Sequence, residues 1–255
     1  MKKGIRSFFL LVTAIWFGIG CQDKDPNKIT VAAAANMQLP MEQIVKKYTE
    51  TYGIDCDLII GSSGKLTAQI VEGAPYDIFV AANMKYPEAV YAAGKAKDLP
   101  KIYANGKLVL WSLTHESPIS INTLKEPQIN HIALANPKTA PYGVAAKQVL
   151  QYYGLYDSLK DKLVYGESIA QTNQFITSKA AQIGFTAMST VMSQAMRNKG
   201  MWVAMDPEHY TLISQGIVLI KRERDNEMEV QGFYDFLFSE EAKEVLKDFG
   251  YLMDE

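Results

Sequence analysis

Four short segments of the sequence place small and polar residues where a strand pattern gives way to a helix pattern. They are Ala35-Asn36-Met37, Gly61-Ser62-Ser63-Gly64, Ala140-Pro141-Tyr142-Gly143 and Glu167-Ser168-Ile169-Ala170. The first N–H groups of a helix have no partner inside it, and the helix dipole leaves partial positive charge there. Such helix ends bind anions without Lys or Arg. Asn and Ser are also ordinary helix caps, so an anion site requires that several of these segments come together.

Alternating strand and helix patterns supply the elements that would position these segments. Strand patterns occupy 29–35, 57–60, 77–81, 107–112, 132–135, 163–165, 183–186 and 212–220. Helix patterns occupy 40–50, 63–72, 87–93, 142–153, 168–178, 188–197, 229–238 and 239–250, and Ser168 and Gln171 have the spacing of a capping box. This rhythm predicts an α/β fold with mostly parallel sheets covered by helices. In such sheets, ligands bind where strands end and helices begin.

The rhythm pauses after 107–112, restarts, and returns in the long strand at 212–220, which predicts two lobes. Lobe 1 would comprise residues 28–105 and 209–255, and lobe 2 would be inserted as residues 106–208. A chain of 255 residues is long enough for two lobes of about 100 residues each. A cleft between two lobes suits a small ligand and a closing motion.

Residues 1–21 have the pattern of a lipoprotein signal peptide. A cationic start is followed by an apolar run at 8–19, too short to span a bilayer comfortably, and then by Gly18-Ile19-Gly20-Cys21. Gly18 stands where the usual pattern has Leu, so a plain secretory signal or an uncleaved anchor is the alternative. We expect Cys21 to be lipidated, residues 22–27 to form a tether, and the protein to be extracytoplasmic and anchored to the membrane.

Cys56 is the second of the two cysteines in the sequence. If Cys21 is acylated, Cys56 has no partner for a disulfide. Its place in a strand-like run, between Asp55 and Asp57, predicts a buried structural thiol.

Charge and histidine spacing exclude several classes of function. The net charge of −2 provides no basic field for nucleic acid, and an anionic ligand would have to be held by local donors. His115, His131 and His209 lack metal-ligand spacing. We therefore expect no resident metal or cofactor.

One motif leaves a catalytic alternative open. Ser62-Ser63-Gly64-Lys65 fits the S-x-x-K pattern of serine acyl-enzymes, and Tyr103-Ala104-Asn105 and Lys138-Thr139-Ala140 echo the accompanying motifs. The third motif should end in Gly and lie on a strand, but Pro141 follows at once. A hydrolase that uses Ser62 and Lys65 is therefore the alternative to a protein that is not an enzyme.

Five stretches, in order, resemble the molybdate-binding proteins of molybdate ABC transporters. They span about residues 28–252 and read VAAAANMQLPMEQIVKKY, GSSGKLTAQIVEGAPYDIFVAAN, ANPKTAPYGVAAKQVL, GESIAQTNQFITSKAAQIGF and FYDFLFSEEAKEVLKDFGY. The resemblance implies a two-lobed type II periplasmic-binding fold. It also implies a monomer that captures molybdate, or alternatively tungstate or sulfate, and delivers it to an ABC permease.

The same resemblance implies the residues that contact the ligand. It places Asn36, Ser63, Tyr142 and Ile169 around the oxyanion, so that molybdenum is bound only as molybdate. The amide NH₂ of Asn36 and the hydroxyl of Ser63 would donate hydrogen bonds, and Ile169 would contribute a backbone N–H. Some family members have a ligand-contacting Tyr where this chain has Ala187, and Tyr142 or Asn36 would replace that hydroxyl.

Neutral donors without an acceptor favour a fully deprotonated oxyanion. A protonated phosphate would bring an O–H that needs an acceptor, and an unmet one costs about 1–3 kcal/mol. Asp77 and Glu167 lie near the four segments. We predict that they are structural carboxylates that accept backbone N–H bonds.

Overall fold

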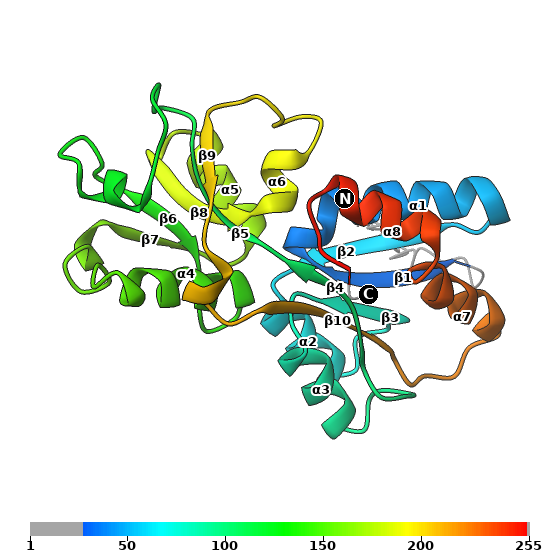
Figure 1. Cartoon of the computed structure of the whole chain (residues 1–255). Helices are drawn as coiled ribbons and strands as arrows, with labels where there is room; N and C mark the ends of the chain where they lie inside the picture. Colours follow the sequence, from blue (N-terminus) through cyan, green and yellow to red (C-terminus); the bar gives the residue numbers. More distant parts are fainter. Residues whose placement is uncertain (1–27, 254–255) are drawn as a thin grey trace, which may run out of the picture.

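The computed structural model describes residues 28–253. The predicted signal peptide, Cys21 and the tether lie outside the described residues. The described chain forms two α/β lobes side by side, each built on a five-stranded sheet with helices on its faces (Figure 1). Both sheets are mixed, with parallel pairing from one edge to the central strand and antiparallel pairing from there to the other edge.

Lobe 1 has the strand order β2-β1-β3-β10-β4, in which β10 is antiparallel to both of its neighbours. Its strands are β1 (Ile29–Ala34), β2 (Cys56–Gly61), β3 (Ile78–Ala81), β4 (Lys101–Gly106) and β10 (Ile213–Leu219). Its helices are the short η1 (Ala35–Met37), α1 (Gln38–Tyr52), α2 (Ser63–Val71), α3 (Lys85–Ala92), α7 (Glu227–Phe236) and α8 (Glu240–Asp248).

Lobe 2 has the strand order β7-β6-β8-β5-β9, in which β5 is antiparallel to both of its neighbours. Its strands are β5 (Leu108–Ser112), β6 (Ile132–Ala135), β7 (Leu163–Gly166), β8 (Ile183–Ala187) and β9 (Met201–Ala204). Its main helices are α4 (Pro141–Tyr152), α5 (Ile169–Thr177) and α6 (Met188–Met192).

The chain passes between the lobes twice. The first passage is at Lys107, between β4 and β5, and the second lies between β9 and β10. The first passage is a single residue, and the second contains the short helix η4 (Pro207–His209). The two lobes therefore lie next to each other (Figure 1).

Side chains along the strands of lobe 1 point alternately to its two faces, so the hydrophobic core of lobe 1 has two layers. Ile29, Val31 and Ala33 pack against α1, α7 and α8, whereas Ala32 faces α2 and α3 on the other side of the sheet. Side chains of a strand point alternately to opposite faces, so a strand covered on both faces is apolar throughout. All six residues of β1 are buried.

Three elements differ from the sequence-based expectation. Strands β4 and β9 were not predicted; each is the last strand at one edge of its sheet. Lys101 and Asn105 interrupt the apolar pattern of β4. β9 is a short apolar run that alternates between half-buried and exposed residues, and periodicity alone does not identify such a run as a strand. Helix α6 ends at Met192, earlier than predicted, because Ser193 takes an extended conformation.

Asp77 directly precedes β3 and links several segments of lobe 1 through its side chain. Its side chain is buried, accepts a hydrogen bond from the N–H of Thr30 at 2.7 Å, and forms ion pairs with Arg222 and Arg224 at 3.0 and 3.1 Å. It is thus a structural carboxylate, as predicted. Glu167, by contrast, is exposed.

Cys56 is half-buried and free, and burial together with Asp55 and Asp57 raises the pKa of its thiol to about 12. The thiol therefore stays protonated at neutral pH and is a poor nucleophile, which agrees with a structural role.

We expect Asp77→Ala to lower the free energy of unfolding by about 3–5 kcal/mol, because it leaves the largely buried Arg224 without a counter-charge. Asp57→Ala is the matched control: its ion pair with Lys28 is solvent-exposed, and its loss should cost less than about 1 kcal/mol. Urea unfolding of both variants measures the difference. Equal losses would contradict a special role for Asp77.

Candidate functional site

The four predicted contact residues line one cavity between the lobes. Asn36 and Ser63 come from lobe 1, and Tyr142 and Ile169 come from lobe 2. The rest of the lining consists of small or uncharged residues, namely Ala34, Ala35, Ser62, Ala82, Ala140 and Pro141. No charged side chain is among these lining residues. A charged ligand in this cavity would therefore be held by neutral groups alone.

The cavity is small. Its volume is about 10 Å³, roughly what one water molecule requires. Sites for drug-sized molecules are typically about 300–1,000 Å³. The lobes are thus closed around a space that suits only a compact group.

Ser63 presents two donors to this cavity. It is the first residue of α2, so its N–H has no partner in the helix. Its Oγ accepts a hydrogen bond from the N–H of Ala82 at 2.9 Å. Because that bond uses a lone pair, the hydroxyl proton remains free to donate.

Tyr142 and Ile169 stand at the starts of two helices of lobe 2. Pro141 is the first residue of α4 and has no N–H, so the N–H of Tyr142 is the first donor of that helix. Ile169 follows the N-cap Ser168. Both residues therefore offer backbone N–H groups at the positive end of a helix dipole.

The predicted capping box of α5 is formed only in part. The Ser168 hydroxyl accepts from the N–H of Gln171 at 3.4 Å, but the Gln171 side chain accepts from the N–H of Glu167 at 2.7 Å rather than from that of Ser168. The segment before the helix is fixed by these two bonds.

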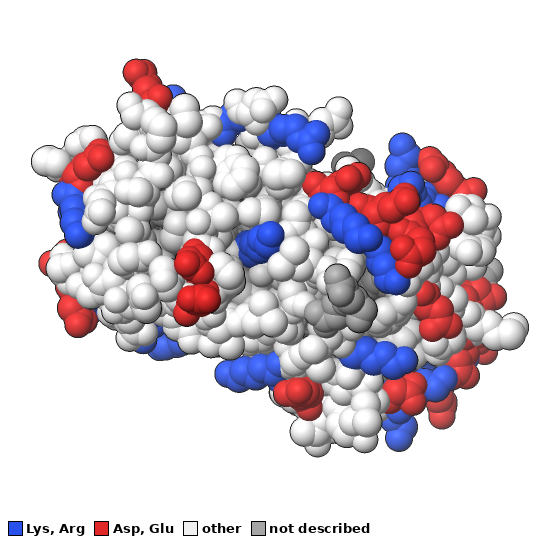
Figure 2. Space-filling model, in the orientation of Figure 1, with Lys and Arg blue, Asp and Glu red and all other residues white. Residues whose placement is uncertain are grey.

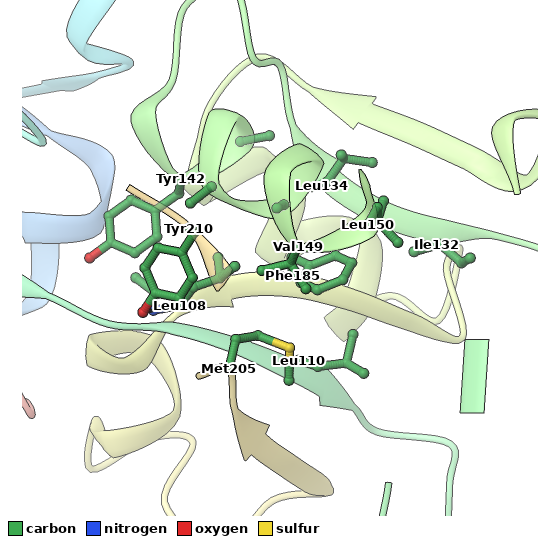
Figure 3. Packing of buried hydrophobic residues seen from close by; sticks show 14 of the residues in the cluster. Leu108, Leu110, Ile132, Leu134, Tyr142, Val149, Leu150, Phe185, Met205 and Tyr210 are labelled. Carbon is green, nitrogen blue, oxygen red and sulfur yellow. Dashed lines mark hydrogen bonds between the residues drawn. The ribbon is translucent and has the colours of Figure 1, made fainter. Parts of the chain in front are cut away.

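The Tyr142 hydroxyl lies inside the protein, against lobe 1. Figure 3 shows the rings of Tyr142 and Tyr210 at one end of the lobe 2 core, with Phe185 and Val149 deeper inside it. Burial and the neighbouring Tyr251 hydroxyl raise the pKa of Tyr142 well above its usual value, so the group is neutral. A Cβ on Gly106 would collide with this hydroxyl, which explains the glycine there.

The side chain of Asn36 is used differently from our expectation. Its Nδ2 donates to Gln215 Oε1 at 2.8 Å and to Tyr251 OH at 2.9 Å, which engages both amide hydrogens. Gln215 cannot be turned around, because its own Nε2 donates to the carbonyls of Ala82 and Ile213. Asn36 therefore borders the cavity with an amide NH₂ that is held by the protein, and the donor it can offer is its backbone N–H.

Direct contacts hold the two lobes together beside the cavity. The N–H of Gly64 in α2 donates to the carbonyl of Thr139 at 2.9 Å, and the Ser189 hydroxyl in α6 donates to the carbonyl of Asn36 at 2.8 Å. Ala187, at the end of β8, is buried and has no polar side chain. Tyr142 and Asn36 were expected to replace the missing hydroxyl at this position. The side chains of both already form hydrogen bonds with lobe 1 side chains.

The Ser62–Lys65 arrangement does not support the catalytic alternative. The Ser62 hydroxyl caps α2 by accepting from the backbone N–H of Lys65 at 3.4 Å. The Lys65 side chain is exposed and lines a wider outer cavity of about 300 Å³ together with Glu167. Ser62 thus serves as a helix cap, and Lys65 lies toward solvent.

The described surface has no dominant charge of one sign. On the face shown in Figure 2, residues of both signs lie together over lobe 1 on the right, and much of the remaining face is uncharged. Within residues 28–253, no group of three or more His, Cys, Asp or Glu side chains is placed to hold a metal ion. None of the described helices has the length and apolar character needed to cross a membrane.

Sequence-based reasoning missed several residues around the cavity. Gln215, Tyr251 and Ser189 bond to Asn36, and Thr139 bonds to α2. Tyr251 closes the last of the five stretches that carry the family resemblance, which was the available signal for it. Thr139 lies in the third of these stretches, whereas Gln215 and Ser189 lie in segments without a distinctive motif.

Comparison with known proteins gives consistent matches over nearly the whole described chain. The family model described as bacterial extracellular solute-binding protein matches residues 29–252. The molybdate-binding protein ModA of Azotobacter vinelandii is 36% identical over 94% of this chain and 96% of its own. YvgL of Bacillus subtilis (strain 168), provisionally named an ABC transporter substrate-binding lipoprotein, is 29% identical over 98% of this chain and 99% of its own.

A solved structure confirms the predicted two-lobed fold. The periplasmic molybdate-binding protein of Azotobacter vinelandii matches with a TM-score of 0.84 at 32% identity, covering 89% of this chain and 100% of that chain.

Gly64 provides a test of lobe closure. A Cβ at this position would lie 3.0 Å from Thr139 Cα and 3.1 Å from its carbonyl oxygen. We expect Gly64→Ala to destabilise the closed form by about 1–3 kcal/mol, as overpacking does, and to increase the radius of gyration in X-ray scattering. Because Ala favours a helix over Gly by up to about 1 kcal/mol, thermal stability should not fall. A variant as compact as the wild type would count against this contact as a limit on closure.

Proposed function

Because the chain belongs to the family of bacterial extracellular solute-binding proteins, we propose that it captures molybdate outside the cytoplasm and delivers it to the permease of an ABC importer. The observation that carries this proposal is the small, uncharged cavity between the lobes, bordered by the starts of helices from both. The relatives are solute-binding proteins of transport systems, and their names agree with this function.

The donors around the cavity suit a fully deprotonated oxyanion. The Ser63 hydroxyl and the N–H groups of Ser63, Tyr142 and Ile169 are hydrogen-bond donors at helix starts. A bound dianion is stabilised there without an ion pair, which avoids burying a fixed cation. The nearest acidic side chain of the predicted segments, Glu167, lies in the outer cavity, where it does not line the inner site.

The names of the relatives favour molybdate within the class of tetrahedral oxyanions, and the small cavity suits a compact ion of this class. Tungstate has the same charge and a similar shape, and sulfate is smaller, so these ions are the appropriate competitors. Molybdate is the transported substrate in this proposal, and no resident cofactor is required.

The cellular setting of the proposal follows from the sequence of the N-terminal region. Cys21 would carry the lipid, residues 22–27 would form the tether, and the lobes would lie at the outer surface of the membrane as a monomer. The protein would act by binding and release rather than as an enzyme, and the permease would be its macromolecular partner.

Calorimetric titration of the chain without its predicted signal peptide tests the proposal. We expect one molybdate per chain, tungstate binding of similar strength, and sulfate binding at least about tenfold weaker, which corresponds to about 1.4 kcal/mol. Tight sulfate binding with weak molybdate binding would assign a different ligand to the same site. No heat and no thermal shift with any of the three ions would refute the proposed function.

Ser63→Ala should weaken molybdate binding by about 1–3 kcal/mol, because it removes a hydroxyl donor to a charged ligand. Lys65→Gln is the matched control on the same helix. Its side chain lies in the outer cavity, so affinity should change by less than about threefold at physiological salt. The reverse order of effects would indicate that the anion binds in the outer cavity.

A further inference from the structure

Backbone hydrogen bonds of the C-terminal segment fix the position of Tyr251. Gly250, with a φ of +80°, ends α8, and the N–H of Tyr251 then donates to the carbonyl of Leu246 at 3.0 Å. The next residue, Leu252, exchanges two backbone hydrogen bonds with Asn105 in β4, at 2.7 and 2.9 Å. These bonds fix the backbone on both sides of Tyr251, and its ring is buried.

The Tyr251 hydroxyl contacts both lobes. It accepts from Asn36 Nδ2 at 2.9 Å, donates to the carbonyl of Asn36 at 3.0 Å, and lies 3.4 Å from Ser189 Oγ. It also contacts the Tyr142 hydroxyl, a contact that contributes to the pKa values of both tyrosines. Asn36 belongs to lobe 1, whereas Ser189 and Tyr142 belong to lobe 2.

A continuous series of hydrogen bonds links Tyr251 to Ser63. Tyr251 bonds to the Asn36 amide, the Asn36 amide bonds to Gln215, and Gln215 Nε2 donates to the carbonyl of Ala82 at 3.1 Å. The N–H of Ala82 then donates to Ser63 Oγ at 2.9 Å. One continuous hydrogen-bond network therefore orients Asn36 and Ser63, the two predicted contact residues of lobe 1.

We propose that Tyr251 is a positioning residue of the oxyanion site, which holds Asn36 in place and couples the occupied site to lobe closure through Ser189 and Tyr142. This inference rests on the proposed function.

Tyr251 does not line the cavity, so it acts through Asn36 rather than by touching the ligand. The carbonyl of Asn36 accepts from Tyr251 and from Ser189, which holds the η1 turn that borders the cavity. Separation of the lobes would break the bonds to Ser189 and Tyr142 while leaving those between Tyr251 and Asn36 within lobe 1. The hydroxyl therefore makes its lobe 2 contacts only in the closed state, and loss of those contacts should affect ligand release more than ligand entry.

The test compares Tyr251→Phe with Tyr103→Phe. Tyr103 is a matched control because it is buried beside Tyr251 and its hydroxyl has no hydrogen-bond partner among the described residues. Both changes remove one oxygen and keep the ring. Association and release of molybdate are measured by stopped flow, and the compaction that accompanies binding is measured by X-ray scattering.

We expect Tyr251→Phe to accelerate molybdate release by about tenfold, consistent with the loss of a buried hydrogen-bonding group, with an association rate within about twofold of wild type. Tyr103→Phe should leave both rates unchanged. Ser189→Ala, which removes the lobe 2 hydroxyl that contacts both the Asn36 carbonyl and the Tyr251 hydroxyl, should also accelerate release. A merely structural effect would lower thermal stability without separating the two rates.

Two results would overturn the inference without touching the proposed function. One is wild-type release from Tyr251→Phe, and the other is equal acceleration in Tyr251→Phe and Tyr103→Phe while the wild type still binds molybdate. If the wild type bound none of molybdate, tungstate and sulfate, the proposed function and this inference would fail together.

Discussion

The structure depends on helix N–H groups that have no partner within their own helix. One helix can leave only its first few such groups free, and these point along a single axis. A tetrahedral anion presents oxygens in several directions, so donors must approach it from several sides. The fold meets this requirement by ending strands of two separate sheets at one junction, where α2 of lobe 1 and α4 and α5 of lobe 2 begin. The insertion of lobe 2 into lobe 1 is what makes this convergence possible.

Because the donors are neutral, binding of an anion depends on closure of the two lobes. With no fixed cation in the cavity lining, neither lobe alone has a strong attraction for an anion, and only the closed arrangement combines both sets of donors. The polar contacts between the lobes near the site are few, with Gly64–Thr139 and Ser189–Asn36 the clearest examples. A modest differential affinity of the ligand for the closed form is then enough to shift the balance between open and closed states.

Periodic patterns predicted the α/β fold class and most central elements, because buried strands and amphipathic helices have strong periodic signals. The family was predicted from the resemblance of five stretches of the sequence. Strand β4 was missed because Lys101 and Asn105 interrupt its apolar pattern. Strand β9 was missed because it is a short apolar run, which periodicity alone does not identify as a strand. The motifs identified residues that line the cavity, but they did not reveal that the Asn36 amide is held by Gln215 and Tyr251. Those partners lie 179 and 215 residues away in the sequence, and only the tertiary fold brings them together.

The tyrosines around the site make its polar network neutral as well as buried. Burial raises the pKa of Tyr142 well above its usual value and that of Tyr251 to about 12. A raised pKa keeps the phenol protonated in the folded protein at every pH below that value, so the network donates and accepts without changing charge. Asn36, Gln215 and Ser189 do not titrate in this range. Between about pH 6 and pH 9, neither these groups nor a fully deprotonated oxyanion changes charge, so the affinity should stay constant over that range.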